Sequence, residues 1–266
     1  MTYSLLTIEQ MFYIMSLRED AMNTKSRKQL LEYTISAIQK RWGHQAIHTA
    51  VEEAPLVLST GFPALDRALG TGGLPRGRLS ELIGCGTAGQ GTLAIQAIAQ
   101  AQRVGQQVAY VDVEHTIDLD ALARAGVRLE TLVVLRPLSL SHALEMTGDL
   151  VAAGAVGTII LDHLHDLALL TQSEAAQGLD RALREWTPQL GRSLCTMIIL
   201  TETASPGLYP SGLALPYFAS VRLECERQNW LRHRGRITGF IARVRVLKNK
   251  LGPSGQEVLL KIRIGG

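Results

Sequence analysis

Cysteine is scarce in this chain, and long apolar runs are missing from it. The three cysteines among the 266 residues lie far apart, as Cys85, Cys195 and Cys225. This small, odd number argues against a disulfide framework or a cysteine metal cluster, and it suits a reducing cytoplasm. No apolar run reaches the roughly 18 residues that a membrane-spanning helix needs, and the first residues lack the pattern of a secretory signal. We therefore expect a cytoplasmic protein without a membrane segment.

Acidic residues are few at the C-terminal end of the chain. Residues 218–266 hold eleven lysines and arginines but only three glutamates, whereas the whole chain has a net charge of only +3. Such an imbalance is typical of a protein that binds a polyanion. The alternative is a solvated strand face with alternating charges, which the period-two spacing of Arg243 and Arg245 fits equally well. Together with Arg222, these two arginines are our candidate contacts to a polyanion.

From residue 78 onward, β-type apolar runs alternate with helical stretches. This alternation predicts an α/β fold with a mostly parallel, twisted sheet that helices cover on both faces. The expected strands are 78–84, 107–113, 131–136, 156–162 and 196–202, and the expected helices are 91–104, 118–126, 139–153 and 175–190. Three further strand-like runs follow without helices between them, so we expect antiparallel strands to extend the sheet at 218–227, 237–248 and 257–264.

The N-terminal part of the chain has a different pattern. Apolar residues spaced by three and four over 27–42 predict an amphipathic helix, which Gly43 would end. Residues 44–58 resemble an extended linker. We therefore divide the chain into an N-terminal helix with its linker, over 1–57, and a core domain, over 58–266.

Residues 84–92 read Gly-Cys-Gly-Thr-Ala-Gly-Gln-Gly-Thr, between an expected strand and an expected helix. In the phosphate-binding pattern G-x-x-x-x-G-K-[ST], backbone N–H groups cradle phosphates, the lysine reaches the outer phosphates and the hydroxyl holds Mg²⁺. Gly84 and Gly89 keep this spacing, but Gln90 and Gly91 replace the lysine and the hydroxyl residue. A strand-to-helix turn that binds no ligand is the alternative interpretation.

The two replacements remove the side chains that hold the outer phosphates. Their loss costs roughly 3–6 kcal/mol, or about two to four decades of affinity. Thr92 has a hydroxyl, but one residue further along a helix it points about 100° away. The lysine also stabilises charge in the transition state, so turnover suffers more than binding. We expect no significant ATP hydrolysis, no firmly bound cofactor, and at most weak binding of ATP and Mg²⁺.

Acidic residues end two of the expected strands. The second strand ends in Asp112-Val113-Glu114-His115, and the fourth ends in Asp162. Ligands of an open parallel sheet bind beyond the C-terminal ends of its strands. An acid after an apolar strand holds Mg²⁺ in nucleoside triphosphatases, and a nearby glutamate can orient the attacking water. The alternative is that these acids cap the helices that follow.

These residues together resemble the family of the bacterial recombinase RecA, from about residue 27 to 266. The likeness rests on the strings 58–61, 72–78, 112–115, 218–223 and 246–250. The resemblance implies a RecA-like P-loop nucleoside triphosphatase core and a role in DNA repair and recombination. It also implies that Glu114 stands where the family has its catalytic base, and that Asp162 would bind Mg²⁺ if the metal is bound at all.

The chain departs from the family at further positions. The adenine-stacking tyrosine of the family corresponds to Ala121, although Asp118 keeps the neighbouring acid. The Asn-Gln pair that senses the outer phosphate corresponds to Thr201 and Glu202, so an acid replaces a neutral sensor. A negative charge at that point further disfavours a triphosphate.

Other elements of the family are short or absent here. The DNA-lining loops correspond to about 164–175 and 203–216, and the chain stops where the family's C-terminal domain begins. Lys248 and Lys250 remain, and in the family such lysines sense the nucleotide of a neighbouring subunit. We therefore predict a non-catalytic or weakly nucleotide-binding paralogue that binds DNA, above all single-stranded DNA, or a recombinase filament. The resemblance further implies self-association, with residues 1–57 as an oligomerisation arm.

Two alternatives remain open on the sequence. One is an adaptor of the ImuA type, which would serve a translesion polymerase in the SOS response to DNA damage. The other is a DNA-dependent ATPase that works with an altered phosphate loop. Phosphate release that disappears in Glu114→Gln would favour the ATPase, and a translesion polymerase encoded nearby would favour the adaptor.

Overall fold

The protein is described by a computed structural model, which contains two compact units, Met1–Glu53 and Ala54–Gly266. The residues whose structure can be described are 26–43, 47, 56–164, 174–205, 207–209 and 212–263. In the first unit a helix spans residues 26–42, which confirms the helix predicted there. None of the helices in these ranges is long and apolar enough to cross a membrane.

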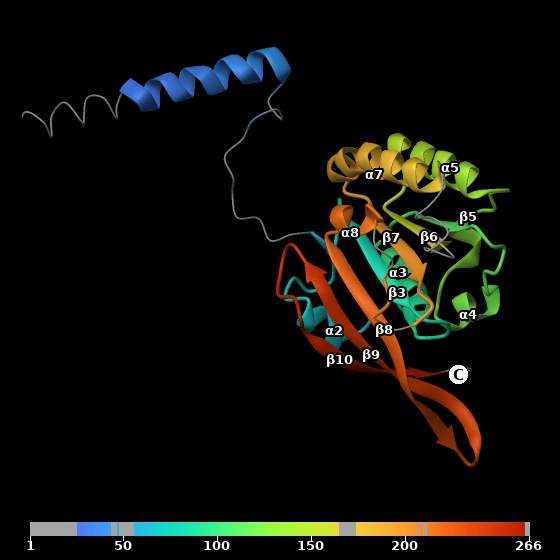
Figure 1. The fold of residues 1–266 in the computed structure, drawn as a ribbon. Helices are drawn as coiled ribbons and strands as arrows, with labels where there is room; N and C mark the ends of the chain where they lie inside the picture. The colour runs from blue at the N-terminus through green and yellow to red at the C-terminus, as the bar shows by residue number, and fades with distance from the viewer. Residues whose placement is uncertain are drawn as a thin grey trace, which may run out of the picture. The chain divides into compact units, whose positions relative to one another are not determined.

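The second unit is built on an eight-stranded sheet with the order β10-β9-β8-β3-β7-β6-β4-β5 (Figure 1). The strands from β5 to β8 in this order are parallel, whereas β9 and β10 are antiparallel additions. The predicted α/β fold with antiparallel strands at its C-terminal end is therefore confirmed. The strand bounds are β3 (Leu79–Gly84), β4 (Val108–Asp112), β5 (Leu132–Leu135), β6 (Thr158–Leu164), β7 (Thr196–Glu202), β8 (Val221–His233), β9 (Arg236–Asn249) and β10 (Glu257–Arg263).

Helices connect the parallel strands, because two parallel strands need a long crossover between them. Helices α5 and α7 lie side by side on one face of the sheet (Figure 1), and α3 packs on the opposite face. The remaining elements are short. The bounds are α2 (Pro63–Ala68), α3 (Gln90–Arg103), α4 (Leu119–Arg124), η2 (Leu129–Thr131), α5 (Leu140–Ala153), α7 (Glu174–Ser193), α8 (Leu215–Phe218), β1 (Val57–Leu58) and β2 (Leu74–Pro75).

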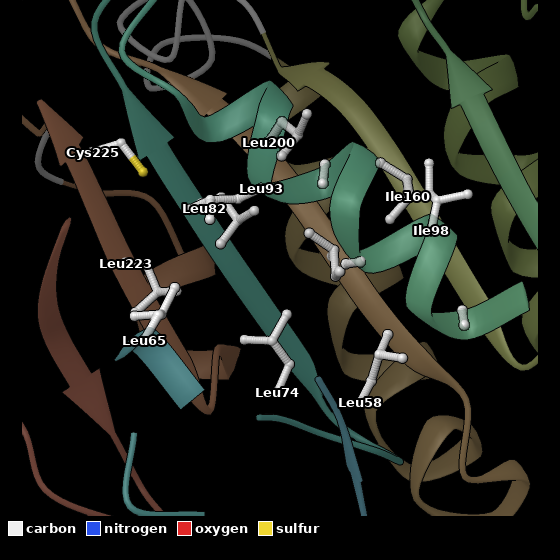
Figure 2. Packing of buried hydrophobic residues seen from close by; sticks show 14 of the residues in the cluster. Leu58, Leu65, Leu74, Leu82, Leu93, Ile98, Ile160, Leu200, Leu223 and Cys225 are labelled. Carbon is white, nitrogen blue, oxygen red and sulfur yellow. The ribbon is translucent and has the colours of Figure 1, made fainter. Parts of the chain in front are cut away.

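The central strands are apolar on both faces because helices cover both. Leu82, Ile160 and Leu200 face α3, where Leu93 and Ile98 complete the cluster that Figure 2 shows. The residues that alternate with them in the strands face α5 and α7 instead. This double burial explains why the strands read as continuous apolar runs in the sequence.

The hairpin of β8 and β9 is longer than the sequence predicted. Both strands continue to His233 and Arg236, which pair across a two-residue turn. The turn residues Arg234 and Gly235 have φ values of 48° and 77°, as in the primed turns that match the twist of a hairpin. Residues 228–236 are polar apart from Trp230 and Leu231 and lack apolar alternation, so no periodicity marked them as strand. The hairpin extends well beyond the rest of the sheet (Figure 1).

Candidate functional site

The strand ends that the sequence singled out lie together at one edge of the sheet. Gly84 at the end of β3 is paired with Glu202 at the end of β7, and Asp112 at the end of β4 is paired with Asp162 of β6. The four strands are adjacent and parallel in the order β3-β7-β6-β4. Their C-terminal ends therefore line the edge at which open α/β sheets bind ligands.

The loop from Cys85 to Gly89 has the shape of a turn from a strand into a helix. Gly89 precedes the first residue of α3 and has a φ of 111°. A Cβ atom at Gly89 would come within 2.7 Å of Ile262 Cδ1, so the glycine is required by both its conformation and its packing. The loop backbone is thereby pressed against β10.

Gln90, which replaces the expected lysine, folds back over the loop. Its Nε2 donates a hydrogen bond of 2.9 Å to the carbonyl oxygen of Gly86, and the residue is 3% exposed. A Cβ atom at Gly84 would clash with the Gln90 side chain, so the glutamine amide lies directly against the end of β3. Its Oε1 is buried without a hydrogen-bond partner among the described residues. An acceptor oxygen therefore stands where a phosphate would need a donor.

Glu202 holds a backbone donor of the same loop. Its Oε1 accepts a hydrogen bond of 3.0 Å from the N–H of Gly86. In a phosphate-binding loop such N–H groups point at the anion. The chain therefore places its own carboxylate where a phosphate oxygen would be held, and the like charge disfavours a second anion there.

The residues after β7 fasten the loop further. The backbone N–H of Thr203 donates to the carbonyl oxygen of Gly84 at 2.9 Å. The thiol of Cys85 donates to the carbonyl oxygen of Ala204 at 3.4 Å. Cys85 is half-buried, and it is a free thiol, as are the buried Cys195 and Cys225.

Asp162, the expected metal ligand, accepts a hydrogen bond from the Tyr110 hydroxyl on β4. Burial, and then the neighbouring Asp162 carboxylate, raise the pKa of Tyr110 far above its ordinary value. The phenol therefore keeps its proton and remains a donor to the carboxylate. Asp162 is 5% exposed, so at Oδ2 the Tyr110 hydroxyl would compete with a metal ion inside the protein.

The acids near the end of β4 have structural contacts. Asp112 is fully buried and accepts a hydrogen bond of 2.8 Å from the N–H of Thr116, and Arg136 lies 3.6 Å from its Oδ2. Asp118 caps α4, since its Oδ1 accepts a 2.8 Å hydrogen bond from the N–H of Ala121. The residue that caps α4 is therefore Asp118 and not the strand-end acid Asp112, for which the capping alternative was raised. Glu114 lies in the turn between β4 and α4 and is partly exposed.

Gly91 and Thr92 lie in the first turn of α3 and are partly exposed. A Cβ atom at Gly91 would meet nothing within 4 Å, so the fold has room for the missing hydroxyl side chain. The described residues contain no group of three or more histidines, cysteines or acids that could hold a metal ion. Gln90, Glu202 and Tyr110 together do not fit Mg²⁺-ATP.

The predicted contact of Arg222 with a polyanion disagrees with its position. Its Nε donates to Glu81 Oε2 at 2.5 Å, and its side chain is only 13% exposed. Glu81 lies fully buried in β3 and also accepts hydrogen bonds from Thr201 Oγ1 at 3.0 Å and from the Tyr209 hydroxyl at 2.6 Å. Arg222 is therefore bound to a carboxylate inside the protein.

Tyr209 and Glu81 were not recognised from the sequence. Burial, followed by the Glu81 carboxylate, raises the pKa of Tyr209 well above its ordinary value. The Arg222 guanidinium lies 4.4 Å from the centre of the Tyr209 ring. An acid in the middle of an apolar strand was the available signal, because a buried charge needs partners. Tyr209 thus joins segment 203–216 to the sheet.

Arg243 and Arg245 lie on the open face of β9 among glutamates of β8 and β10. Arg243 is paired with Glu226, and Arg245 lies 2.7 Å from Glu257 and 3.6 Å from Glu224. This is the alternating-charge face that the sequence left open as an alternative. The pairs neutralise much of the charge that a polyanion would need.

Lys248 and Lys250 both contact the C-terminal end of the short helix α8. The Nζ atom of Lys248 donates to the carbonyl oxygens of Pro216 and Tyr217, at 2.5 and 3.2 Å. Lys250 also donates to the carbonyl oxygen of Tyr217, at 3.2 Å. Burial, and then Lys250, lower the pKa of Lys248. Of the two loops expected to line DNA, most of 164–175 lies outside the described residues.

A turn of phosphate-loop type between a central parallel strand and a helix defines the class of P-loop nucleoside triphosphatase folds. Comparison with known proteins narrows this class. The family model described as the RecA N-terminal domain matches residues 29–266. The chain is 34% identical to Protein RecA of Brucella anthropi and to Protein RecA of Brucella canis, over 94% of this chain and 75% of each relative. The chain belongs to the RecA family, and this membership indicates a role in DNA recombination or repair.

Proposed function

We propose that this protein is a RecA-family member that does not hydrolyse ATP and acts in DNA repair as a binding partner. Its ligands would be single-stranded DNA and the filament of an intact recombinase. The observation that carries the proposal is the Glu202 carboxylate on the N–H of Gly86, at 3.0 Å. That contact fills the anion-binding position of the loop from within the chain.

Two other contacts support the absence of ATP hydrolysis. Gln90 folds back onto the Gly86 carbonyl oxygen with an amide that carries no charge, so the outer phosphates would lack their cation. Tyr110 holds Asp162 by a hydrogen bond, which competes with a metal ion for the carboxylate. No observation favours an altered ATPase chemistry over this interpretation.

The test of this proposal is equilibrium binding of labelled ATP to the full chain, with and without Mg²⁺ and single-stranded DNA, together with phosphate release. We expect no Mg²⁺-dependent ATP binding and no phosphate release above that of Glu114→Gln, while DNA still binds. Tight Mg²⁺-dependent binding, with hydrolysis that disappears in Glu114→Gln, would overturn the proposal.

The proposed recombinase partner would use Lys248 and Lys250. Both contact the Tyr217 carbonyl oxygen, and Lys250 lies over the exposed Tyr217 ring. Adding the protein to an ATP-competent recombinase should change the length or the ATPase rate of the filament, and Lys248→Ala/Lys250→Ala should weaken the effect. An adaptor for a translesion polymerase is the second candidate. It is favoured by the short segment 203–216, which Tyr209 ties to Glu81 rather than leaving open to DNA. Binding to a translesion polymerase with no effect on the recombinase would select it.

A further inference from the structure

The outer half of the β8–β9 hairpin is the most basic projecting element of the described structure. Its residues 227–238 contain four arginines and one histidine but no acid. Every residue of this stretch is exposed except Leu231, which is half-buried. The hairpin extends away from the sheet (Figure 1), so its outer half can be reached from several sides.

The arginines near the hairpin turn differ from those at its base. Arg243 and Arg245 are paired with glutamates of the neighbouring strands. Arg232, Arg234 and Arg236 take part in no ion pair within the part of the chain that the structure describes. The positive charge available to a partner is therefore at the turn, not at the base that the sequence pointed to.

An aromatic side chain stands next to this charge. Trp230 is 41% exposed, and its ring contacts two neighbours that restrict its motion. The Arg227 guanidinium lies 4.3 Å from the ring centre, and the Phe240 ring packs edge-on at 5.9 Å between centres. Trp230 is thus a held, partly open ring, the kind of platform on which an unpaired base stacks.

The hairpin is also fastened at its base. Arg227 Nη1 donates a hydrogen bond of 3.1 Å to the carbonyl oxygen of Thr87 in the phosphate-loop turn. This contact joins β8 to the loop between β3 and α3 and helps to fix the direction in which the hairpin leaves the sheet. A hairpin that is already held in one direction lowers the entropic cost of binding a partner.

We propose that this hairpin is the surface that binds single-stranded DNA, with Arg232, Arg234 and Arg236 against phosphates and Trp230 stacked on a base. The inference rests on the proposed function, since it assumes that DNA is a ligand. Three arginines without an ion pair attract any polyanion, but the exposed ring beside them selects a strand with unstacked bases. An acidic protein offers no such face to Trp230.

The test compares the full chain with Arg232→Gln/Arg234→Asn/Arg236→Gln by fluorescence anisotropy of a labelled oligothymidine at several salt concentrations. Asparagine suits the first position of a primed turn, so the hairpin keeps its turn while it loses three charges. We expect the affinity to fall at least about tenfold, and the slope of log K against log salt to fall by about 2, at roughly 0.7 for each phosphate contact.

The matched control removes three exposed arginines from other parts of the core. Arg67→Gln/Arg103→Gln/Arg192→Gln has the same net charge as the hairpin variant, and all three positions are exposed. We expect its affinity to stay within about twofold of the natural chain, since contacts with phosphates, and not net charge alone, determine binding. A thermal melt of each variant checks that both remain folded.

Stacking has its own readout in tryptophan fluorescence. The chain has three tryptophans, of which Trp186 is buried and Trp42 is exposed. In Trp42→Phe, oligothymidine should quench the remaining fluorescence, and the additional change Trp230→Phe should abolish the quenching while it keeps a ring against Phe240.

The outcomes separate the hairpin from the proposed function. Equal DNA affinity of the hairpin variant and the control would overturn the hairpin site alone. Absence of DNA binding by the natural chain would overturn both proposals. Competition by polyglutamate as strong as competition by unlabelled oligothymidine would also overturn the hairpin site, because an acidic protein would then be the ligand. Selective loss in the hairpin variant, with quenching through Trp230, supports the proposal.

Discussion

At the scale of single residues, the chain's own side chains contact the groups that would face a phosphate or a metal ion in a working phosphate loop. Glu202 takes the N–H of Gly86, Gln90 covers the end of β3, and Tyr110 donates to Asp162. Each of these internal hydrogen bonds engages a group that would otherwise be open to a phosphate or a metal ion. The proposed loss of nucleotide binding therefore rests on several positions and not on one missing lysine.

Restoring the motif tests this interpretation. The variant Gln90→Lys/Gly91→Thr/Glu202→Gln returns the cation and the hydroxyl and removes the competing carboxylate, and Gly91 has room for a side chain. We expect ATP to bind at least about 100-fold more tightly, because two charge-assisted contacts contribute roughly 3–6 kcal/mol. Calorimetric titration with Mg²⁺-ATP measures the change. Gln90→Lys alone should gain less, since Glu202 keeps its place. A triple variant that binds no better than the natural chain would refute this account.

At the scale of elements, a buried network joins segment 203–216 to the sheet. Glu81 of β3 accepts hydrogen bonds from Arg222 of β8, Thr201 of β7 and Tyr209 of the segment. A buried carboxylate is tolerated because each oxygen has a partner. The Gly207 N–H also donates to Glu224 Oε1 at 2.9 Å, so residues 207–209 are held at two points.

Two substitutions in this network should have unequal effects. Tyr209→Phe removes one of three donors to Glu81 and should lower the free energy of unfolding by about 1 kcal/mol. Arg222→Met leaves a buried carboxylate without its cation and should lower it by about 3–5 kcal/mol. Urea denaturation followed by circular dichroism compares them. Equal effects of the two changes would show that Arg222 is not the essential partner of Glu81.

At the scale of the whole molecule, the hydrophobic core belongs to the second unit. Among the described residues, all members of the hydrophobic clusters lie between Leu58 and Ile262. The division between the two units falls at Glu53 and Ala54. Self-association through the N-terminal helix stays a prediction.

Removal of residues 1–53 should leave the core folded and abolish self-association. We expect the shortened chain to melt at an unchanged temperature, since no core cluster loses a residue, and to elute as a monomer. Light scattering after size-exclusion chromatography, with a thermal melt, measures both. If the shortened chain still assembles like the full chain, self-association uses a part of the chain other than residues 1–53.

Particular elements show which parts of the fold could be predicted from the sequence. It predicted the parallel strands and the helices between them, because apolar periodicity is a local property that double burial makes strong. It missed the outer half of the β8–β9 hairpin, whose residues 228–236 are exposed apart from Leu231 and carry no apolar alternation. For Arg222 the sequence showed the positive charge but not its partner. The structure pairs the guanidinium with Glu81 on another strand, and the sequence cannot show which strands are neighbours.

The sequence by itself determined the fold class, the family likeness and the loss of the loop lysine and hydroxyl at Gln90 and Gly91. Only the tertiary structure decided which side chains contact the loop and Asp162. Glu202 reaches Gly86 across 116 positions of the chain, and Tyr110 reaches Asp162 across 52. Such pairs follow from the strand order and register of the sheet. Periodicity and motif spacing are properties of neighbouring residues, whereas a contact between distant strands exists only once the sheet has formed.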